Sequence, residues 1–258
     1  GQSCTSVERV YVHEKIFNEF KQELLRQAAL IKVAVDQKGD ADYGKMTVKK
    51  QIEVINAQLA EAKQKGAKLL WGEEWDQNSD FIPPLILENL RPDMKIIRDE
   101  TFGPALPLST FRTEEEVIQM ANDSEYGLSA SVWSKDIVRA QRVARALKTG
   151  NVSINNVMLT EGNHALPFGG VKNSGFGRYK GEFGFYSFSN IKSVLIDQDS
   201  KKIEANWYPY TTQKFKLFEQ MMTGLFSKGL LAFIRFAISG LKLESYSQSV
   251  FKKNRHSG

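Results

Sequence analysis

Amphipathic helices alternate with short apolar strands from Val7 to Asn155, and this alternation most constrains the fold. Val7–Val12 alternates apolar and polar residues, as a half-buried strand does. The stretch 13–33 then places apolar residues at helical spacing, and 48–70 predicts a second helix followed by a short strand. Strands separated by helices favour parallel pairing with helices on the faces of the sheet. The sequence therefore predicts a layered α/β domain with a mostly parallel, open sheet flanked by helices, followed by a C-terminal helical extension.

Local signals mark where several of these elements begin and end. Gly66 is a stop signal for the second helix. Thr113 is the expected N-cap of a helix that precedes a turn and another strand. A further helix over 135–150 is expected to end at Gly150, with a strand directly after it. The two prolines of 81–90 predict an irregular lead into one more strand.

The composition is that of a globular protein without an internal disulfide. Hydrophobic residues make up 41% of the 258 residues and charged residues 25%, which is ordinary for a folded domain. Cys4 is the only cysteine, so no disulfide can form within the chain, and a reducing compartment such as the cytoplasm is expected. The net charge is +5, but the basic residues alternate with acidic ones or lie on helix faces, as on a solvated surface. We therefore expect no nucleic acid among the partners.

The densest glycine cluster, 167–185, does not match a nucleotide-binding loop. It lacks the glycine spacing and the Gly-Lys-Ser/Thr triplet of a P-loop. It also lacks the strand-to-helix turn that carries a dinucleotide fingerprint. By itself this cluster favours tight turn packing over ligand binding.

Glu100 stands directly before a Phe-Gly-Pro bend, next to an apolar stretch. A carboxylate held at such a bend can accept hydrogen bonds from sugar hydroxyls. Taken alone, Glu100 is better read as an ordinary surface acid at a turn.

Cys4 with the downstream His164 and Asn173 invites comparison with papain-like cysteine proteases. The residues after Cys4 lack that family's glycine, second cysteine and aromatic residue. His164 and Asn173 lie in one glycine-rich loop with no strand between them, and a single cysteine excludes the family's structural disulfides. The sequence therefore argues against a protease.

Taken in order, several motifs resemble the aldehyde dehydrogenase superfamily. The order and approximate spacing both fit for GQSC, KGAK, ETFGP, ANDSEYGLSASVWS, GNVSINN and PFGGVKNSGFGR. The resemblance runs from Gly1 to about Ile196. It implies the catalytic-domain fold of that family and the oxidation of an aldehyde to a carboxylic acid with NAD or NADP as cofactor.

The resemblance assigns the nucleophile to Cys4. As a thiolate, Cys4 would attack the aldehyde carbon and give a thiohemiacetal. Transfer of hydride to a nicotinamide ring would leave an acyl thioester, which water then cleaves. The backbone N–H of Cys4 would supply half of an oxyanion hole.

The same resemblance assigns further site residues and no metal ligand. The residues expected at the nicotinamide ribose, beside the nicotinamide ring and at the adenosine ribose are Glu100, Phe102 and Gln51. The residues expected in the substrate funnel or its variable wall are Phe168, Asn156 and His164. Core packing is an equal alternative for Phe168.

The predicted organisation has three segments. They are an aldehyde dehydrogenase catalytic domain over 1–186, an oligomerisation strand with a linker over 187–200, and an amphipathic helical extension over 201–258. The family's cofactor domain precedes the nucleophile, so we expect that domain, its general-base glutamate and most phosphate contacts to be absent from this chain. The isolated chain is therefore predicted not to oxidise aldehydes, and the late strand implies a homo-oligomer, dimer or tetramer, of the complete enzyme.

Two other functions stay open for the isolated chain: a Cys4-dependent esterase or thiol hydrolase, and a non-enzymatic dimerisation module. A functional thiolate should react faster with a small thiol reagent than an ordinary free cysteine does. This reactivity separates both enzymatic hypotheses from the structural one.

The C-terminal extension is predicted to present a wide apolar helical face over 218–241. Lys228 and Arg235 interrupt the apolar run, so it is too short and too charged to span a membrane. It could lie in a membrane interface, cover the substrate funnel or pack in a dimer groove. The sequence favours packing of this face against protein, and peripheral contact with a membrane is the alternative. The expected location of the protein is the cytoplasm, with membrane association if the alternative holds. The extension also resembles those of aldehyde dehydrogenases that act on long-chain or aromatic aldehydes, so both are candidate substrates.

Overall fold

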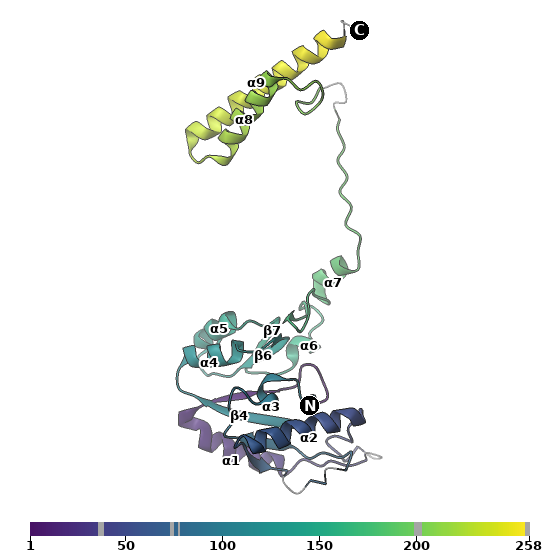
Figure 1. Ribbon diagram of the computed structural model, residues 1–258, viewed down its shortest axis with the longest axis vertical. Helices are drawn as coiled ribbons and strands as arrows, with labels where there is room; N and C mark the ends of the chain where they lie inside the picture. The colour runs from purple at the N-terminus through teal and green to yellow at the C-terminus, as the bar shows by residue number, and fades with distance from the viewer. Residues whose placement is uncertain (36–38, 73–74, 77, 199–202, 256–258) are drawn as a thin grey trace. The chain divides into compact units, whose positions relative to one another are not determined.

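The computed structural model describes residues 1–35, 39–72, 75–76, 78–198 and 203–255. The chain divides into two compact units, Gly1–Ile191 and Lys192–Gly258. The first unit contains all the strands of the described residues, and the second contains the helices α8 (Thr212–Phe226) and α9 (Leu230–Arg255) (Figure 1). Among the described residues, no helix has both the length and the apolar character needed to cross a bilayer.

The main sheet of the first unit has four strands. Their order across the sheet is β1 (Val10–His13), β4 (Ala105–Phe111), β3 (Leu85–Glu88) and β2 (Lys68–Trp71). β1 and β3 run parallel to the central β4, and β2 is antiparallel to β3 at the edge. The predicted α/β fold with a mostly parallel sheet is confirmed.

Two smaller sheets complete the first unit. β6 (Ser129–Val132) pairs in parallel with β7 (Asn151–Ile154), and α5 (Ile137–Ala146) connects them. β5 (Tyr126–Gly127) pairs antiparallel with β8 (Val171–Lys172). The strands of the described residues are therefore divided among three sheets.

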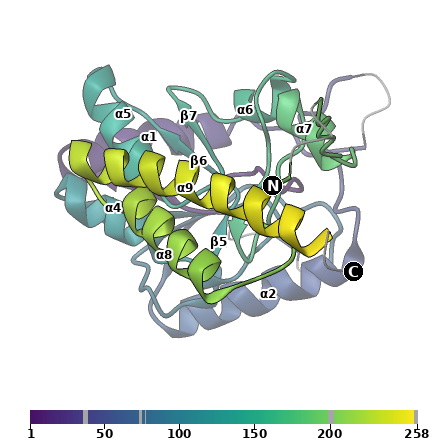
Figure 2. The ribbon, with the colours of Figure 1, turned by 90° about the horizontal axis from the view of Figure 1, so that it is seen from above.

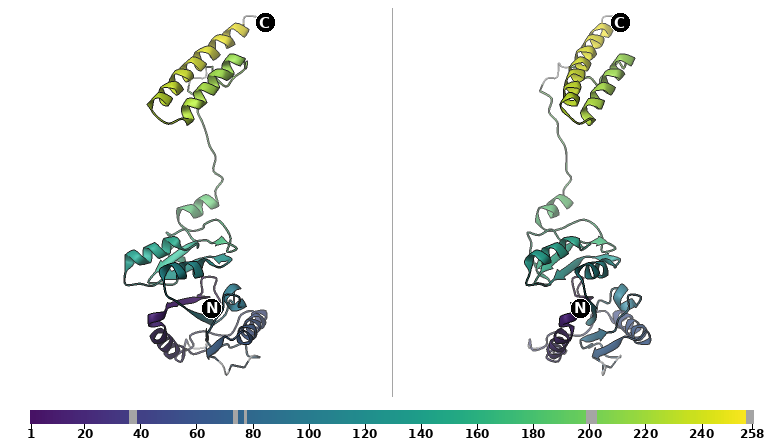
Figure 3. Two further views of the ribbon diagram at one scale, coloured as in Figure 1. Left: turned by 60° about the vertical axis from the view of Figure 1, so that its left-hand side comes forward. Right: turned by 90° about the vertical axis from the view of Figure 1, so that its left-hand side faces the viewer.

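Helices cover both faces of the main sheet. α1 (Phe17–Ala28), which follows a 3-10 turn at Glu14–Ile16, packs through Ala28 against Ile86. α2 (Lys49–Gln64) packs on the other face, where Leu85 and Leu87 meet its buried side chains, and the short α3 (Lys95–Arg98) adjoins it (Figure 3). Because successive side chains of a strand point to opposite faces, β3 is buried on both and is apolar at consecutive positions.

Two of the local signals are confirmed. The Thr113 hydroxyl accepts the backbone N–H of Glu116 at 3.2 Å, so Thr113 is the N-cap of α4 (Glu114–Asn122). α2 ends at Gln64, and Gly66 follows with φ +96°. Glycine adopts this left-handed conformation without the strain that a Cβ brings.

The expectation that Gly150 ends a helix is wrong. α5 already ends at Ala146, and Leu147 is its C-cap. A Cβ placed on Gly150 would lie 1.8 Å from the carbonyl oxygen of Gly169. Gly150 is required because two backbone segments cross there, and that crossing is made by residues distant in sequence.

Residues 188–198, where a strand that joins another subunit's sheet is expected, contain neither helix nor strand within this chain, and their pairing with a second subunit stays a prediction. The helical extension differs from expectation in one respect. The apolar run over 218–241 is not one continuous helix, because the chain leaves the helical path between α8 and α9. Gly229 has φ +104°, which lets the chain reverse so that α8 and α9 pack side by side as a hairpin (Figure 2).

Candidate active site

Cys4 lies on an exposed turn that its neighbours hold in place. The backbone N–H of Ser6 donates to the carbonyl of Ser3 at 3.0 Å, which closes the turn around Cys4. Cys4 is a free, exposed cysteine. The next residue, Thr5, is buried, and its hydroxyl donates to Oε2 of Glu161 at 2.7 Å. The turn therefore combines an accessible thiol with a fixed backbone.

A second anchor lies before the cysteine. The side-chain oxygen of Gln2 accepts the backbone N–H of Thr47 at 2.8 Å, and its nitrogen donates to the carbonyl of Lys45 at 3.3 Å. An amide side chain suits this position because it carries an acceptor and donors together.

The turn adjoins the loop that contains Glu100. A Cβ on Gly1 would lie 1.8 Å from the carbonyl oxygen of Gly103, so the two backbones are in direct contact. Only glycine permits this approach. Two motifs that the sequence separates by about a hundred residues therefore meet in one place.

The side chain of Glu8 binds the backbone of the loop that contains Glu100. Its two carboxylate oxygens accept the backbone N–H groups of Thr101 and Phe102, each at 3.0 Å. Burial is the main cause that raises the pKa of the Glu8 carboxyl, those two N–H groups lower it in part, and the charge of Glu100 raises it further. The loop is thus tied to the segment that follows Cys4.

The helix α2 fixes the same loop from the other side. Gln51 donates to the carbonyl of Thr101 at 2.6 Å, and Gln58 accepts the Thr101 hydroxyl at 2.8 Å. Thr101 is buried, whereas the side chain of Glu100 is exposed. Phe102 is half-buried and has φ +48°. The contacts of Gln51 are those of a loop support, and its expected contact with an adenosine ribose stays a prediction.

The expected funnel residues gather around α6 (Leu159–Gly162). The side-chain oxygen of Asn156 accepts the backbone N–H groups of Met158 and Leu159 at 3.1 and 3.0 Å and so caps the start of this helix. His164 is exposed and follows the helix. Because Glu161 of α6 binds Thr5, this segment lies beside the Cys4 turn.

Phe168 lies deeper than the other expected funnel residues. Its side chain is 3% exposed and meets the ring of Tyr179 edge-on, with 5.5 Å between ring centroids. The ammonium group of Lys180 lies 5.4 Å from the Phe168 ring and also donates to the carbonyl of Glu161. Lys180 thereby links Phe168 to the α6 segment, and the contribution of Phe168 to a substrate funnel stays a prediction.

Sequence reasoning missed the residues that assemble this site. Glu8, Gln58 and Glu161 each bind a residue far away in the sequence. Glu8 gave a weak signal, as a carboxylate at the start of an apolar strand. In the part of the chain that the structure describes, no group of three or more His, Cys, Asp and Glu side chains could hold a metal ion.

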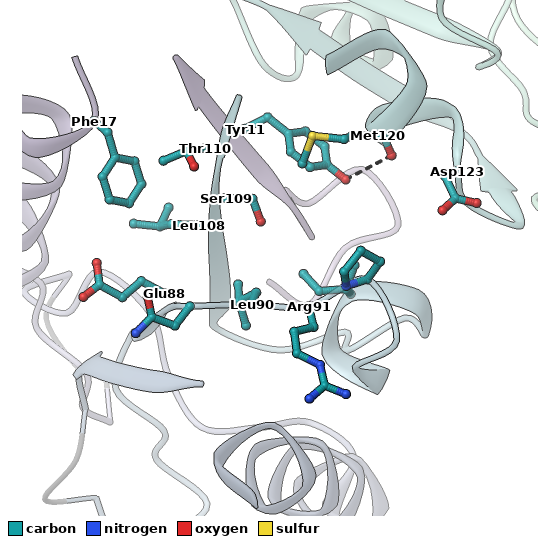
Figure 4. A pocket seen from close by; sticks show the side chains of 13 residues that line it. Tyr11, Phe17, Glu88, Leu90, Arg91, Leu108, Ser109, Thr110, Met120 and Asp123 are labelled. Atoms are coloured by element: carbon teal, nitrogen blue, oxygen red, sulfur yellow. Dashed lines mark hydrogen bonds between the residues drawn. The ribbon is translucent and has the colours of Figure 1, made fainter. Parts of the chain in front are cut away.

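A cavity of about 280 Å³ lies elsewhere in the first unit, between β1, β4 and α4 (Figure 4). Tyr11 lines it and donates from its hydroxyl to the carbonyl of Met120 at 3.3 Å. None of the expected site residues lines this cavity. It is therefore separate from the Cys4 turn.

Comparison with known proteins decides the family. A model of the Aldehyde dehydrogenase family matches residues 1–194. The chain belongs to the aldehyde dehydrogenase family. The match covers the whole first compact unit and only the first three residues of the second, so the helices α8 and α9 lie outside it.

Individual relatives place the chain within a longer protein family. The chain is 42% identical over 234 residues to a 4,4'-diapolycopene aldehyde oxidase of Methylomonas sp. This match covers 91% of the chain and 42% of that relative. It is 38% identical over 200 residues to a chloroplastic betaine aldehyde dehydrogenase of Atriplex hortensis, covering 76% of the chain and 39% of that relative. The chain thus spans about two fifths of the length of the relatives it matches.

Solved structures of the family agree with the fold. A betaine aldehyde dehydrogenase point mutant from Staphylococcus aureus, in complex with NAD+ and with a BME-modified cysteine, superimposes with a TM-score of 0.73 at 33% identity. It covers 81% of the chain, which matches 43% of that structure. A succinate-semialdehyde dehydrogenase from Burkholderia pseudomallei gives a TM-score of 0.69 at 36% identity, with 73% and 39% covered.

Proposed function

We propose that this chain supplies the nucleophile and the nicotinamide-side cofactor contacts of an NAD(P)-dependent aldehyde dehydrogenase, which oxidises an aldehyde to a carboxylic acid. The observation that carries the proposal is the contact between two motifs: the turn of the exposed Cys4 lies against the loop that presents Glu100. Hydride transfer from an adduct on Cys4 to a bound cofactor requires the thiol and the cofactor-binding residue Glu100 to lie close together.

Cys4 performs the covalent step. Its thiolate attacks the aldehyde carbon, a C–S bond forms, and the carbonyl oxygen becomes the thiohemiacetal oxygen. The backbone N–H of Cys4 donates a hydrogen bond to that oxygen as half of an oxyanion hole. After oxidation, water attacks the acyl thioester, the C–S bond breaks, and the thiolate is regenerated as the acid leaves.

The residues of the Glu100 loop fit a nucleotide cofactor. Glu100 presents an exposed carboxylate, which has the acceptor oxygens that ribose hydroxyls require, on a backbone that Glu8 fixes. Phe102 offers a half-buried aromatic side chain next to it. NAD or NADP, when bound, supplies the hydride acceptor. Glu100 and Phe102 would hold its nicotinamide end, and Gln51 supports the loop that carries them.

The chain alone is expected to lack oxidation activity. The relatives are more than twice as long as the part of them that matches, and the family resemblance assigns the general base and most phosphate contacts to sequence outside Gly1–Gly258. The activity is therefore proposed for a protein that contains this chain at the full length of its relatives. In such a protein, aldehyde-dependent reduction of NAD+ or NADP+ should be lost on Cys4→Ala.

An acylation experiment on the chain itself tests the nucleophile. After p-nitrophenyl acetate is added, intact-mass analysis should show one acetyl group on Cys4, and Cys4→Ser should show none. An acetyl group that accumulates fits the proposed dehydrogenase, whereas continuous release of acetate favours the esterase alternative. Absence of acylation would contradict both the dehydrogenase and the esterase hypotheses, and the non-enzymatic dimerisation module would then be the remaining hypothesis.

We infer that the substrate funnel, with Phe168, Asn156 and His164 in its wall, accepts long-chain or aromatic aldehydes. Support comes from the extent of the matches. The 4,4'-diapolycopene aldehyde oxidase covers 91% of the chain, whereas the betaine aldehyde dehydrogenases of Atriplex hortensis and Staphylococcus aureus cover 76% and 81%. In the full-length protein, kcat/KM should be higher for decanal or benzaldehyde than for betaine aldehyde.

We infer a dimer or tetramer for the complete enzyme. The segment 188–196 leaves most of its apolar side chains in water, and Leu195 is 95% exposed. An unpaired apolar segment of this kind can add to the sheet of another subunit. Light scattering should give at least twice the monomer mass for the full-length protein, and Leu195→Lys should reduce that mass.

The single cysteine of the chain supports a cytoplasmic location.

A further inference from the structure

The second unit exposes an apolar face that the hairpin does not use for its own packing. α8 and α9 pack against one another where Gly224 of α8 meets Ala232 and Phe236 of α9. The row of α9 that carries this packing consists of Ala232, Phe236, Ser239 and Leu243. A second row, offset by two residues and therefore about 200° around the helix, consists of Leu230, Ile234, Ala237 and Leu241. This second row faces away from α8.

The outward row is apolar although it is exposed. Leu230 is 75% exposed and Leu241 68%. The end of the hairpin adds further large apolar side chains in water, namely Leu225, Phe226, Leu231 and Phe233. A helix that faces water normally carries polar residues on the side opposite its packing face. A contiguous exposed apolar surface of this kind marks a site of interaction with a protein or a membrane.

Basic residues concentrate in the same hairpin. Eight of the 35 Lys and Arg residues lie in the segment 212–255, but only two of the 30 Asp and Glu residues do. The rest of the chain, with 27 basic and 28 acidic residues, is close to neutral, so the net positive charge of this chain lies in the hairpin. Arg235 and Lys242, two helical turns apart, lie along one border of the outward row, and Lys228 lies at the reversal.

An apolar helix face bordered by cations fits the interface of an anionic bilayer. The apolar side chains enter the boundary between head groups and acyl chains, while Lys and Arg reach anionic head groups. A protein partner would need an acidic surface to match the cations, and the remainder of this chain carries almost no net charge. This favours lipid over a second copy of the chain and reverses the sequence-based preference for packing against protein.

We propose that the α8–α9 hairpin binds peripherally to membranes that contain anionic lipids, with the outward row of α9 seated in the interface. Since neither helix can span a bilayer, the contact is with one leaflet. The proposal does not depend on the proposed reaction, because it needs neither an aldehyde nor a cofactor.

Liposome flotation of the purified 258-residue chain tests it. Vesicles of phosphatidylcholine alone are compared with vesicles in which about one third of the lipid is phosphatidylserine, at low and at high salt. The chain should float with the anionic vesicles, and high salt should reduce the floating fraction. Lys228→Gln with Arg235→Gln should weaken binding to anionic vesicles about thirtyfold, or about 1 kcal/mol per cation removed.

A matched pair of double variants isolates the apolar contribution. Ile234→Gln with Leu241→Gln changes the outward row and should weaken binding at least about tenfold, because both side chains leave the interface. Ile137→Gln with Val138→Gln changes two apolar side chains of comparable exposure on α5 of the first unit and should leave binding unchanged. Circular dichroism of all variants shows whether the helices are intact.

Three results would overturn the proposal. The chain could remain in the bottom fraction with both kinds of vesicle. The outward-row variant could float as well as the unmodified chain does. Light scattering could show a dimer that Ile234→Gln with Leu241→Gln dissociates while lipid has no effect, in which case a second copy of the chain covers this face.

Discussion

Glu8 and Thr101 are 93 positions apart in the sequence, yet the carboxylate of Glu8 accepts the backbone N–H of Thr101 at 3.0 Å. The same carboxylate accepts the N–H of Phe102. This pair joins the segment that carries Cys4, the proposed nucleophile, to the loop that carries Glu100. The donors are backbone groups of the loop, so on this side the loop is held by the single side chain of Glu8, while Gln51 and Gln58 hold it from α2.

Glu8→Ala is expected to destabilise the first unit by about 2 kcal/mol, because hydrogen bonds from backbone N–H groups to a charged acceptor are lost at a partly buried site. Amide hydrogen exchange should show the fastest new exchange at Thr101 and Phe102. Glu19→Ala, at an exposed position on α1, is the control and should change neither. Unchanged protection of Thr101 and Phe102 in Glu8→Ala would contradict the role given to Glu8.

The pH dependence of stability should carry the signature of Glu8. The pKa of this carboxyl is raised in the folded state, chiefly by burial, so the folded chain holds the proton more tightly than the unfolded chain does. Stability from this group is therefore present below the unfolded pKa of about 4.3 and is lost as pH rises through the raised folded pKa.

Glu8→Gln removes this titration. The free energy of unfolding of the unmodified chain, minus that of Glu8→Gln, should decrease as pH rises through that interval and stay constant above it. Denaturant unfolding at a series of pH values measures the difference, with Glu19→Gln as control. A difference that grows with pH would show that the hydrogen bonds outweigh burial and would contradict the prediction.

Gly150→Ala should destabilise the first unit by about 3 kcal/mol or more, because the new Cβ would overlap the carbonyl oxygen of Gly169 and force two backbone segments apart. Gly162→Ala is the matched control, since its Cβ would meet no atom within 4 Å. It should change stability by less than about 1 kcal/mol. Thermal unfolding measures the stability of both variants. Equal destabilisation by Gly150→Ala and Gly162→Ala would refute the crossing of backbone segments as the reason why residue 150 is a glycine.

Lys214→Met should destabilise the second unit by about 1–3 kcal/mol. Lys214 is buried at the start of α8, and its ammonium group donates to the carbonyls of Trp207 and Pro209. Methionine keeps the apolar stem but leaves these carbonyls without their donor. Lys216→Met, at an exposed position two residues away, should be close to neutral. Amide hydrogen exchange over residues 203–255 measures the stability of the second unit separately from that of the first. Equal protection of these amides in Lys214→Met and Lys216→Met would contradict the prediction.

Elements that depend on local chemistry could be predicted from the sequence. The N-cap at Thr113 and the left-handed Gly66 after α2 need only a hydroxyl or a missing Cβ near the end of a helix. The apolar run of β3 likewise indicates a strand buried on both faces, whichever helices cover it. Motif order was sufficient to recognise the family, because each motif keeps its place along the chain.

Contacts between distant segments could not be predicted in this way. Gly150 has the sequence context of a helix stop, but it is a glycine because Gly169 crosses it. The apolar run over 218–241 has helical spacing throughout, and the reversal at Gly229 still divides it, because packing α8 on α9 buries surface that one helix would leave in water. Periodicity reports which residues share a face, not what that face meets.

The sequence by itself determined the α/β class and the first unit's membership of its family, and through that membership it singles out Cys4 and Glu100 as expected site residues. The tertiary structure decided how these residues are held together: through Gly1 against Gly103, through Glu8 under the Glu100 loop, and through Thr5 on Glu161. The physical reason is that side-chain types and their spacing follow local rules of backbone geometry, whereas a hydrogen bond between distant segments exists only after the chain has folded and excluded water from it.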